Sequence, residues 1–368
     1  MRRKIIGLVA LLVVTSGVVA WHLRSDEGST TDPGITTGAQ PTHHLAEALG
    51  IDVWWHKRAP YTTPTEERAE ADAIVRYVDV NLHANSISIG FPIYTSSDTS
   101  DHVFTTKATP STSDLLILIH AAETAGLRIQ MRPLINVGVS SYSWRGRLKP
   151  ANLRAFFTSY YETLKPYLAL AQREKMSSFV YASEFWSLSV KQADAPAWEH
   201  LVSLMSSVYH GRLEYDSSGV PYLRNQVVVP GYAHVMDAYF SVPVGSKATP
   251  AQLYQGWVSR FDQLPASVVA DSTIEELGFI ARSDGYEHPS RVDSGPTDSK
   301  YLYMEDRWFT MACEIVHRFH IRGVYFWNLD FNTDPLTTPG TAESLGPTIW
   351  ADRPGATAIE RCFSRFAA

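Results

Sequence analysis

Cysteine is scarce in this sequence, with only Cys313 and Cys362 among 368 residues. Two cysteines cannot form the disulfide framework of a small secreted domain, and they cannot build a zinc site without further ligands at suitable spacing. Both lie in segments that we interpret as the last two helices. One bridge between them and two buried free thiols are both compatible with the sequence.

An excess of positive charge is also missing, because 32 Lys and Arg face 38 Asp and Glu, for a net charge of -6. Nucleic-acid-binding proteins usually carry a basic stripe that neutralises phosphates, and no such stripe is present. The sequence has no Gly-x-Ser-x-Gly elbow, no phosphate-binding glycine loop and no dinucleotide fingerprint, and its histidines lack metal-ligand spacing. We therefore predict no nucleic-acid partner, no cofactor and no metal.

The N-terminal part has the pattern of an export signal. A basic segment at residues 1–4 is followed by an apolar run at residues 5–21, which is near the minimum length of a membrane-spanning helix. We predict that residues 1–24 are a signal peptide or an N-terminal signal anchor, so that the protein is extracytoplasmic, either secreted or tethered to the membrane. Residues 25–46, rich in Ser, Thr, Gly and Pro, are predicted to be a flexible linker.

Residues 47–368 alternate short β-rich runs with amphipathic helical runs, which predicts parallel strands joined by crossover helices. Eight such units predict an α/β fold, a single-domain (β/α)8 TIM barrel, and we expect a monomer. The predicted strands are 51–55, 86–89, 128–133, 179–184, 212–215, 237–242, 268–277 and 323–328. The first helix is predicted to begin near residue 63, and the others to cover 111–125, 150–174, 195–209, 250–261, 300–319 and 356–366, with only a helical turn at 232–235.

Two of the predicted strands carry glutamate at or near their ends, where the active site of a (β/α)8 barrel lies. Glu184 ends the fourth strand and is followed by two aromatic residues, Phe185 and Trp186. Glu276 lies near the end of the seventh strand, and Gly278 follows it closely. Glycoside hydrolysis needs one protonated carboxyl group and one ionised carboxylate, so this pair predicts a carbohydrate-cleaving enzyme.

The surroundings of the two glutamates suggest their roles. Burial beside aromatic residues raises the pKa of a carboxyl group, which suits Glu184 as the general acid/base. Glu276 is then the nucleophile, with Tyr239 as a candidate hydrogen-bond donor, and a carboxyl separation of about 5 to 5.5 Å would imply retention of anomeric configuration. Glu275 competes with Glu276, because alternation along a strand sends one side chain inward and the other towards the helices. The pattern alone does not choose between them.

Several motifs resemble those of one enzyme family in order and spacing. They are Ala84–Ile89, Gly126–Pro133, Trp144–Gly146, Ala182–Glu184, Tyr209–Tyr215 and Glu276–Phe279. Over roughly residues 50–330 the chain resembles glycoside hydrolase family 113, the β-mannanases of a clan of retaining (β/α)8 hydrolases. The resemblance implies a β-mannan-like polysaccharide or oligosaccharide substrate, and it selects Glu276 over Glu275. The chain departs from the pattern at Ser183, where many clan members carry Asn, and at Phe279, where the family has Tyr.

Further residues at strand ends are candidates for substrate binding. Trp327, which ends the last strand, resembles the clan's tryptophan at the floor of the cleavage subsite, and Arg132 could hydrogen-bond the nucleophile and lower its pKa. Candidate sugar contacts are Trp55, Asn136, Trp144 and Tyr239. Two alternatives remain open: a related glucanase or transglycosylase of envelope glycans, and a barrel that binds glycan without cleaving it.

Overall fold

The computed structural model describes residues 47–57, 62–139, 143–290, 297–332, 335 and 350–367. The predicted signal segment and linker therefore lie outside the described residues, and both remain predictions. Among the helices that are described, none has the length and apolar character needed to cross a membrane.

Eight parallel strands form a closed barrel, as the alternating pattern predicts. They are β1 (Ala48–Trp54), β2 (Ser86–Thr95), β4 (Arg128–Val137), β5 (Ser178–Ser183), β6 (Arg212–Ser218), β7 (Val235–Asp237), β8 (Thr273–Leu277) and β9 (Gly323–Asp330). β1 pairs with both β2 and β9, which closes the sheet on itself. A short strand, β3 (Val103–Phe104), adds to β2 in the antiparallel direction.

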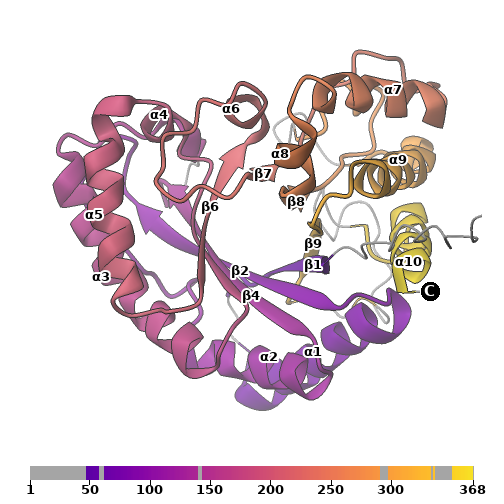
Figure 1. The fold of residues 1–368 in the computed structure, drawn as a ribbon. Helices are drawn as coiled ribbons and strands as arrows, with labels where there is room; N and C mark the ends of the chain where they lie inside the picture. The colour runs from indigo at the N-terminus through magenta and orange to yellow at the C-terminus, as the bar shows by residue number, and fades with distance from the viewer. Residues whose placement is uncertain are drawn as a thin grey trace, which may run out of the picture. The chain divides into compact units, whose positions relative to one another are not determined.

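Helices surround the strands, with α1, α2, α3 and α5 along one part of the barrel and α7, α9 and α10 along another (Figure 1). The longer helices are α1 (Pro64–Arg76), α2 (Thr112–Thr124), α3 (Leu153–Arg173), α5 (Ala195–Ser206), α7 (Pro250–Phe261), α9 (Tyr303–Phe319) and α10 (Pro354–Ala367). Short elements are the π-helical turn Tyr77–Asn81, the 3-10 turns Arg145–Arg147, Gln192–Asp194 and Ser299–Tyr301, and helices α4 (Trp186–Ser189), α6 (Gly219–Leu223) and α8 (Ala266–Ala270). Capping boxes at Thr63, Ser111 and Thr249 begin α1, α2 and α7, because each hydroxyl accepts a backbone N–H that the helix leaves unpaired.

The structure corrects the predicted elements around β7 and β8. Residues 266–270, read partly as strand because of β-branched valines, form helix α8 after Pro265. The predicted strand 237–242 ends at Asp237, because the chain beyond Ala238 leaves the barrel and pairs with the loop after β8 through the Val242 N–H and the Tyr286 carbonyl. The predicted helical turn at 232–235 is wrong, since the helix of this unit is α6.

The interior of the barrel contains several acidic side chains, which is uncommon for a buried core. Five carboxyl side chains from four strands are buried there: Asp52, Glu214, Asp216, Asp237 and Glu275. At the N-terminal ends of the strands, the Gln130 amide donates to Ser178 at 2.8 Å and to Glu214 at 3.1 Å. A small cavity of about 90 Å³ lies beside these side chains.

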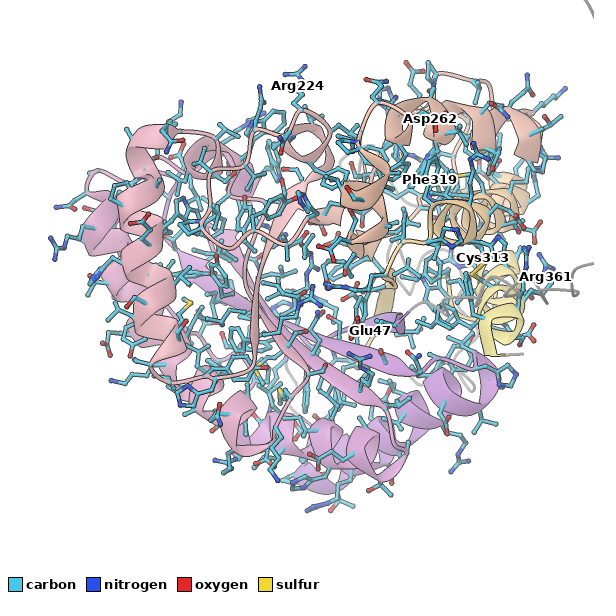
Figure 2. The ribbon with its side chains drawn as sticks, viewed as in Figure 1. Glu47, Arg224, Asp262, Cys313, Phe319 and Arg361 are labelled. Atoms are coloured by element: carbon cyan, nitrogen blue, oxygen red, sulfur yellow. A yellow bond between two sulfur atoms is a disulfide. The ribbon has the colours of Figure 1, made fainter. Side chains whose placement is uncertain are left out.

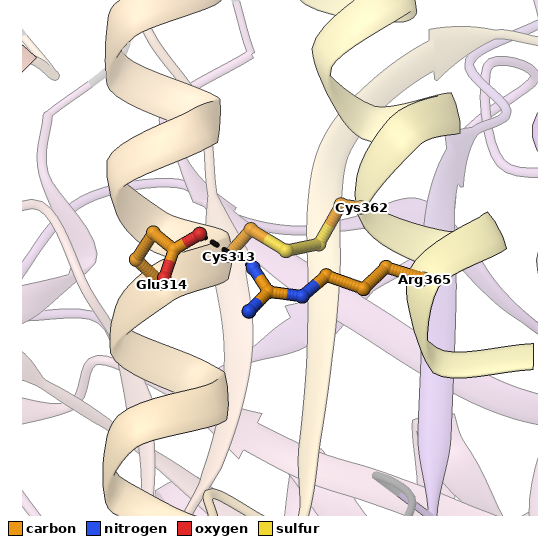
Figure 3. Close-up of a disulfide and its surroundings, with 4 residues drawn as sticks. All are labelled: Cys313, Glu314, Cys362 and Arg365. Atoms are coloured by element: carbon orange, nitrogen blue, oxygen red, sulfur yellow. Dashed lines mark hydrogen bonds and ion pairs between the residues drawn. A yellow bond between two sulfur atoms is a disulfide. The ribbon is translucent and has the colours of Figure 1, made fainter. Parts of the chain in front are cut away.

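A disulfide joins α9 to α10, which decides between the two alternatives left open for the cysteines. Cys313 and Cys362 are bonded, with their Cα atoms 5.7 Å apart. Cys313 and Arg361 lie where the two helices meet (Figure 2). An exposed ion pair between Glu314 and Arg365, with an N–O distance of 2.5 Å, lies next to the bridge (Figure 3).

We expect that replacing both cysteines by serine lowers the free energy of unfolding by about 4 kcal/mol, because the bridge closes a loop with a sequence separation of 49 residues in the unfolded chain. Chemical denaturation of the purified protein measures this loss.

The matched control removes the neighbouring ion pair by replacing Glu314 and Arg365 with glutamine. Because that pair is exposed, the control should lose less than about 1 kcal/mol. Equal losses in the two variants would show that the crosslink itself adds no stability.

Candidate active site

A cleft of about 640 Å³ lies at the C-terminal ends of the barrel strands. Both predicted catalytic residues line it, Glu184 directly after β5 and Glu276 at the end of β8. The other residues that line it are Trp144, Arg145, Ser218, Gly219, Val220, Leu223, Asp237, Tyr239, Phe240, Ser241, Arg260, Ser290 and Trp327. The structure thus brings Trp144, Tyr239 and Trp327 to the same cleft as the two glutamates.

Glu276 is held by two donors, one on each carboxylate oxygen. Arg132 Nη1 donates to Oε2 at 2.7 Å, and the Tyr239 hydroxyl donates to Oε1 at 2.6 Å. Burial and the charge of Glu276 raise the pKa of Tyr239 well above its ordinary value, so the phenol keeps its proton and remains a donor. A Cβ atom at Gly278 would lie 3.0 Å from the Tyr239 hydroxyl, so glycine permits this close approach.

Arg132 is fully buried and binds further acids beneath the cleft. Its Nη2 lies 2.6 Å from Asp216 Oδ2 and 2.9 Å from Asp237 Oδ1, and it donates to Ser183 Oγ at 3.1 Å. Burial opposes the charge of Arg132, but Asp237, Glu276 and Asp216 outweigh it and raise the pKa of the guanidinium. Burial and the neighbouring Asp216 also raise the pKa of Asp237 well above its ordinary value.

Glu184 has a left-handed backbone, with φ of 57°, a conformation that side chains other than glycine seldom adopt. Its N–H donates to the Asp216 carbonyl at 2.7 Å, and Trp144 Nε1 donates to its Oε2 at 2.9 Å. Burial raises the pKa of the Glu184 carboxyl group, Arg145 opposes that shift, and the negative charge of Glu276 adds to it. Gly146 lets the Trp144 ring fold back, since a Cβ atom there would lie 2.4 Å from the ring.

The expectation that Glu275 or Glu276 turns towards the helices is wrong, because both face the barrel interior. The pairing of β8 shifts register against β7 and against β9 around these two residues, which is the signature of a β-bulge. Glu276 reaches the cleft, whereas Glu275 is fully buried and lines the cavity at the opposite end with Gln130 and Glu214. The cleft position of Glu276 agrees with the choice implied by the family resemblance.

Two other predicted sugar contacts lie outside the cleft lining. Trp55 is 1% exposed, and its ring stacks on Phe331 at a centroid distance of 3.6 Å, which is incompatible with a sugar contact. Adjacent strand residues point to opposite faces, so its neighbour Trp54 points the other way. The ring centroids of Trp54 and Trp327 lie 5.7 Å apart. Asn136 is half-buried at the end of β4 and is not among the residues that line the cleft.

Sequence reasoning missed three residues of the site, Asp216, Asp237 and Arg145, and it noted Ser183 only as a departure from the family pattern. Asp216 was detectable in principle, because it is an acidic residue directly after a predicted strand. Asp237 was predicted to begin its strand, whereas the structure places it at the C-terminal end of β7. Their importance depends on Arg132, which they contact from strands far apart in the sequence. Local sequence patterns do not carry such contacts.

One group of side chains in the described part of the chain has ligand atoms close enough to hold a metal ion: His120, Glu123 and Glu174. These residues are exposed or half-exposed and belong to α2 and the end of α3, so they lie apart from the cleft. The glutamates of the cleft bind Arg132, Tyr239 and Trp144.

Comparison with known proteins places the chain among carbohydrate-cleaving barrels. The sequence profile of glycoside hydrolase family 113 matches residues 54–342. A complex structure of a GH113 β-1,4-mannanase superposes on this chain with a TM-score of 0.71 at 15% sequence identity. The match covers 87% of this chain and 99% of the mannanase chain. The GH113 β-mannanase of Alicyclobacillus acidocaldarius superposes with a TM-score of 0.66 at 16% identity, covering 88% and 100%. No curated protein sequence matches the chain.

The closed barrel and the family match define a glycoside hydrolase. More specifically, the chain belongs to glycoside hydrolase family 113, because the match covers most of its length.

One buried acid beneath the site makes stability depend on pH. Burial raises the pKa of Asp52 to about 8, with Arg132 opposing the shift and Glu276 adding to it. Between pH 4 and pH 8 the folded protein therefore holds a proton on Asp52 that the unfolded chain releases, so this residue makes stability fall as pH rises.

We expect the Asp52→Asn variant, which imitates the neutral acid, to gain stability relative to the wild type by up to about 1.4 kcal/mol per unit of pH above about pH 5. Denaturant titrations at pH 5, 6 and 7 measure the difference. Parallel stability curves for the two proteins would contradict the assignment of a proton to Asp52.

Proposed function

We propose that this protein is a retaining glycoside hydrolase of a β-mannan-type polysaccharide, with Glu184 as the acid/base and Glu276 as the nucleophile. One observation carries the proposal. Glu276 is fixed by two donors, at 2.7 and 2.6 Å, in the same cleft as Glu184, whose pKa is raised by burial. The two carboxyl groups therefore have the different environments that the two roles require.

In the first step, the protonated Glu184 donates to the glycosidic oxygen while Glu276 attacks the anomeric carbon. The bond to the leaving sugar breaks, and a covalent glycosyl ester of Glu276 forms. Arg132 and Tyr239 hold the Glu276 carboxylate in place before the attack, since both donate to it.

In the second step, Glu184 removes a proton from water, which attacks the anomeric carbon and releases Glu276. The structure supplies a reason for the change of role. The negative charge of Glu276 helps to raise the pKa of Glu184, and that charge disappears when the ester forms. Glu184 then loses its proton more readily and can act as the base.

The mannan-type substrate is supported by the relatives, which are named as β-mannanases. The cleft also contains Trp144, Tyr239 and Trp327, whose aromatic surfaces suit the apolar faces of sugar rings. Trp144 is 40% exposed and donates a hydrogen bond to Glu184, the proposed acid that protonates the leaving sugar. The ring therefore lies where the leaving sugar would pass.

We also propose that the protein works outside the cytoplasm, secreted or tethered through residues 5–21. The basic and apolar N-terminal pattern supports export. The disulfide between Cys313 and Cys362 supports it independently, because such bonds persist mainly in oxidising compartments.

We expect Glu276→Gln to lower kcat on β-mannan at least about 1,000-fold, because the nucleophile is lost. Glu184→Gln should lose similar activity on mannan but keep the first step on dinitrophenyl glycosides, whose leaving group needs no proton. Stopped-flow and steady-state measurements of product release distinguish the two variants.

The adjacent Glu275→Gln variant is the matched control. Glu275 is buried at the far end of the barrel, and burial keeps its pKa well above the ordinary value, so glutamine replaces a neutral group. It should keep kcat within about tenfold of the wild type. If Glu275→Gln abolishes activity and Glu276→Gln does not, the assignment is wrong. Cleavage of β-glucan in place of mannan would favour the glucanase alternative, and binding without product would favour a non-catalytic barrel.

Retention makes a prediction of its own about the product. Proton NMR spectra recorded during the first minutes of hydrolysis should show the β-anomer of the new reducing end before mutarotation produces the α-anomer. Initial formation of the α-anomer would contradict a nucleophilic role for Glu276.

A further inference from the structure

Besides Arg145, one further basic side chain lines the cleft. Arg260, on α7, is half-buried, and its Nη2 donates to the backbone carbonyl of Ser241. Its guanidinium carbon lies 5.9 Å from the centre of the Phe240 ring, in cation–π range. The guanidinium is therefore held in one place by the loop after β7.

The charge of Arg260 has no acidic partner within ion-pair distance among the residues that the structure describes. Its Nε is buried without a hydrogen-bond acceptor there, and its Nη1 makes no bond to the described residues. Arg132, by contrast, faces three carboxyl groups at distances of 2.6 to 2.9 Å. Arg260 is thus a positioned cation with unused hydrogen-bonding capacity in a substrate cleft.

The chemistry of the guanidinium favours an anionic oxygen as its partner. Arginine binds carboxylates through planar, charge-assisted hydrogen bonds, and these bonds are stronger than those to neutral sugar hydroxyls. An immobilised arginine loses little further side-chain entropy when it binds, which favours the interaction.

The position of Arg260 also restricts where the anionic sugar binds. Glu276 lines the reacting part of the cleft, and its negative charge repels a negatively charged ring there. Arg260 follows β7 in the chain and lies with Phe240 and Ser241 in the lining. An anionic unit held by Arg260 would therefore lie beside the sugar that is cleaved.

We propose that Arg260 binds the carboxylate of an acidic sugar unit, so that the preferred substrate is a β-glycan carrying uronic acid. The inference rests on the proposed hydrolase function and adds the charge class of its substrate. Arg260 then determines specificity and takes no part in the bond-breaking steps.

The test compares one uronic-acid-bearing β-mannan-type oligosaccharide with its carboxyl-reduced form, which differs only in the charged group. The wild-type full chain should show kcat/KM at least about tenfold higher on the acidic form, mainly through a lower KM, because a hydrogen bond to a charged group is involved. The preference should shrink as salt rises from about 0.05 to 0.5 M. Equal kcat/KM on the two forms would overturn the inference, even if Arg260 variants do not fold.

Variants assign the preference to the side chain. Arg260→Gln should lower the ratio of acidic to reduced kcat/KM at least about tenfold, and Arg260→Lys should keep part of the preference. The matched control is Arg318→Gln on α9, since Arg318 also lies over a phenylalanine ring, at 5.3 Å from Phe319, but is exposed and outside the cleft lining. The control should leave the ratio unchanged.

The outcomes separate the inference from the function on which it rests. Cleavage of both forms at equal rates disproves the acidic preference and leaves the hydrolase proposal intact. If the protein cleaves neither form and no other β-glycan, the hydrolase proposal is disproved. A ratio that Arg260→Gln leaves at the wild-type value overturns the role of Arg260.

Discussion

The site depends on the burial of one cation, Arg132, among acids contributed by separate strands. Asp216 connects the two halves of the site: its carboxylate binds Arg132, and its backbone carbonyl accepts the N–H of Glu184. Arg132 in turn binds Glu276. Loss of the guanidinium would leave several buried carboxyl groups without their counter-charge. Breaking a buried ion pair by removing one partner typically costs about 3 to 5 kcal/mol. The contacts that give these buried acids a counter-charge therefore also position both glutamates.

Much of this arrangement was predictable from the sequence. The alternation of strand and helix patterns predicts the barrel, because each parallel strand needs a crossover helix to return to the same end. The rule that active sites lie at the C-terminal ends of barrel strands leads directly to Glu184 and to the pair at residues 275 and 276. The contact of Arg132 with Glu276 was also expected, since both residues were predicted to lie near the ends of their strands.

The remaining features depend on local irregularity and on distant contacts. The bulge in β8 turns two consecutive glutamates into the barrel, whereas simple alternation allows only one. Of the two adjacent tryptophans, Trp54 lies near Trp327 and Trp55 packs in the core, and their identical chemistry hides the difference. Asp216 and Asp237 take their roles from a cation on a strand that is far away in the sequence. No periodic pattern encodes that pairing.

The disulfide encloses the strand that closes the barrel. β9 lies between Cys313 and Cys362 in the chain, and it pairs with β8 on one side and β1 on the other. A protease that cut the chain once anywhere between the two cysteines would therefore leave both fragments covalently joined. The strand that carries Trp327 would stay attached to the molecule from at least one end, so the covalent ring protects the integrity of the barrel where the sheet meets itself.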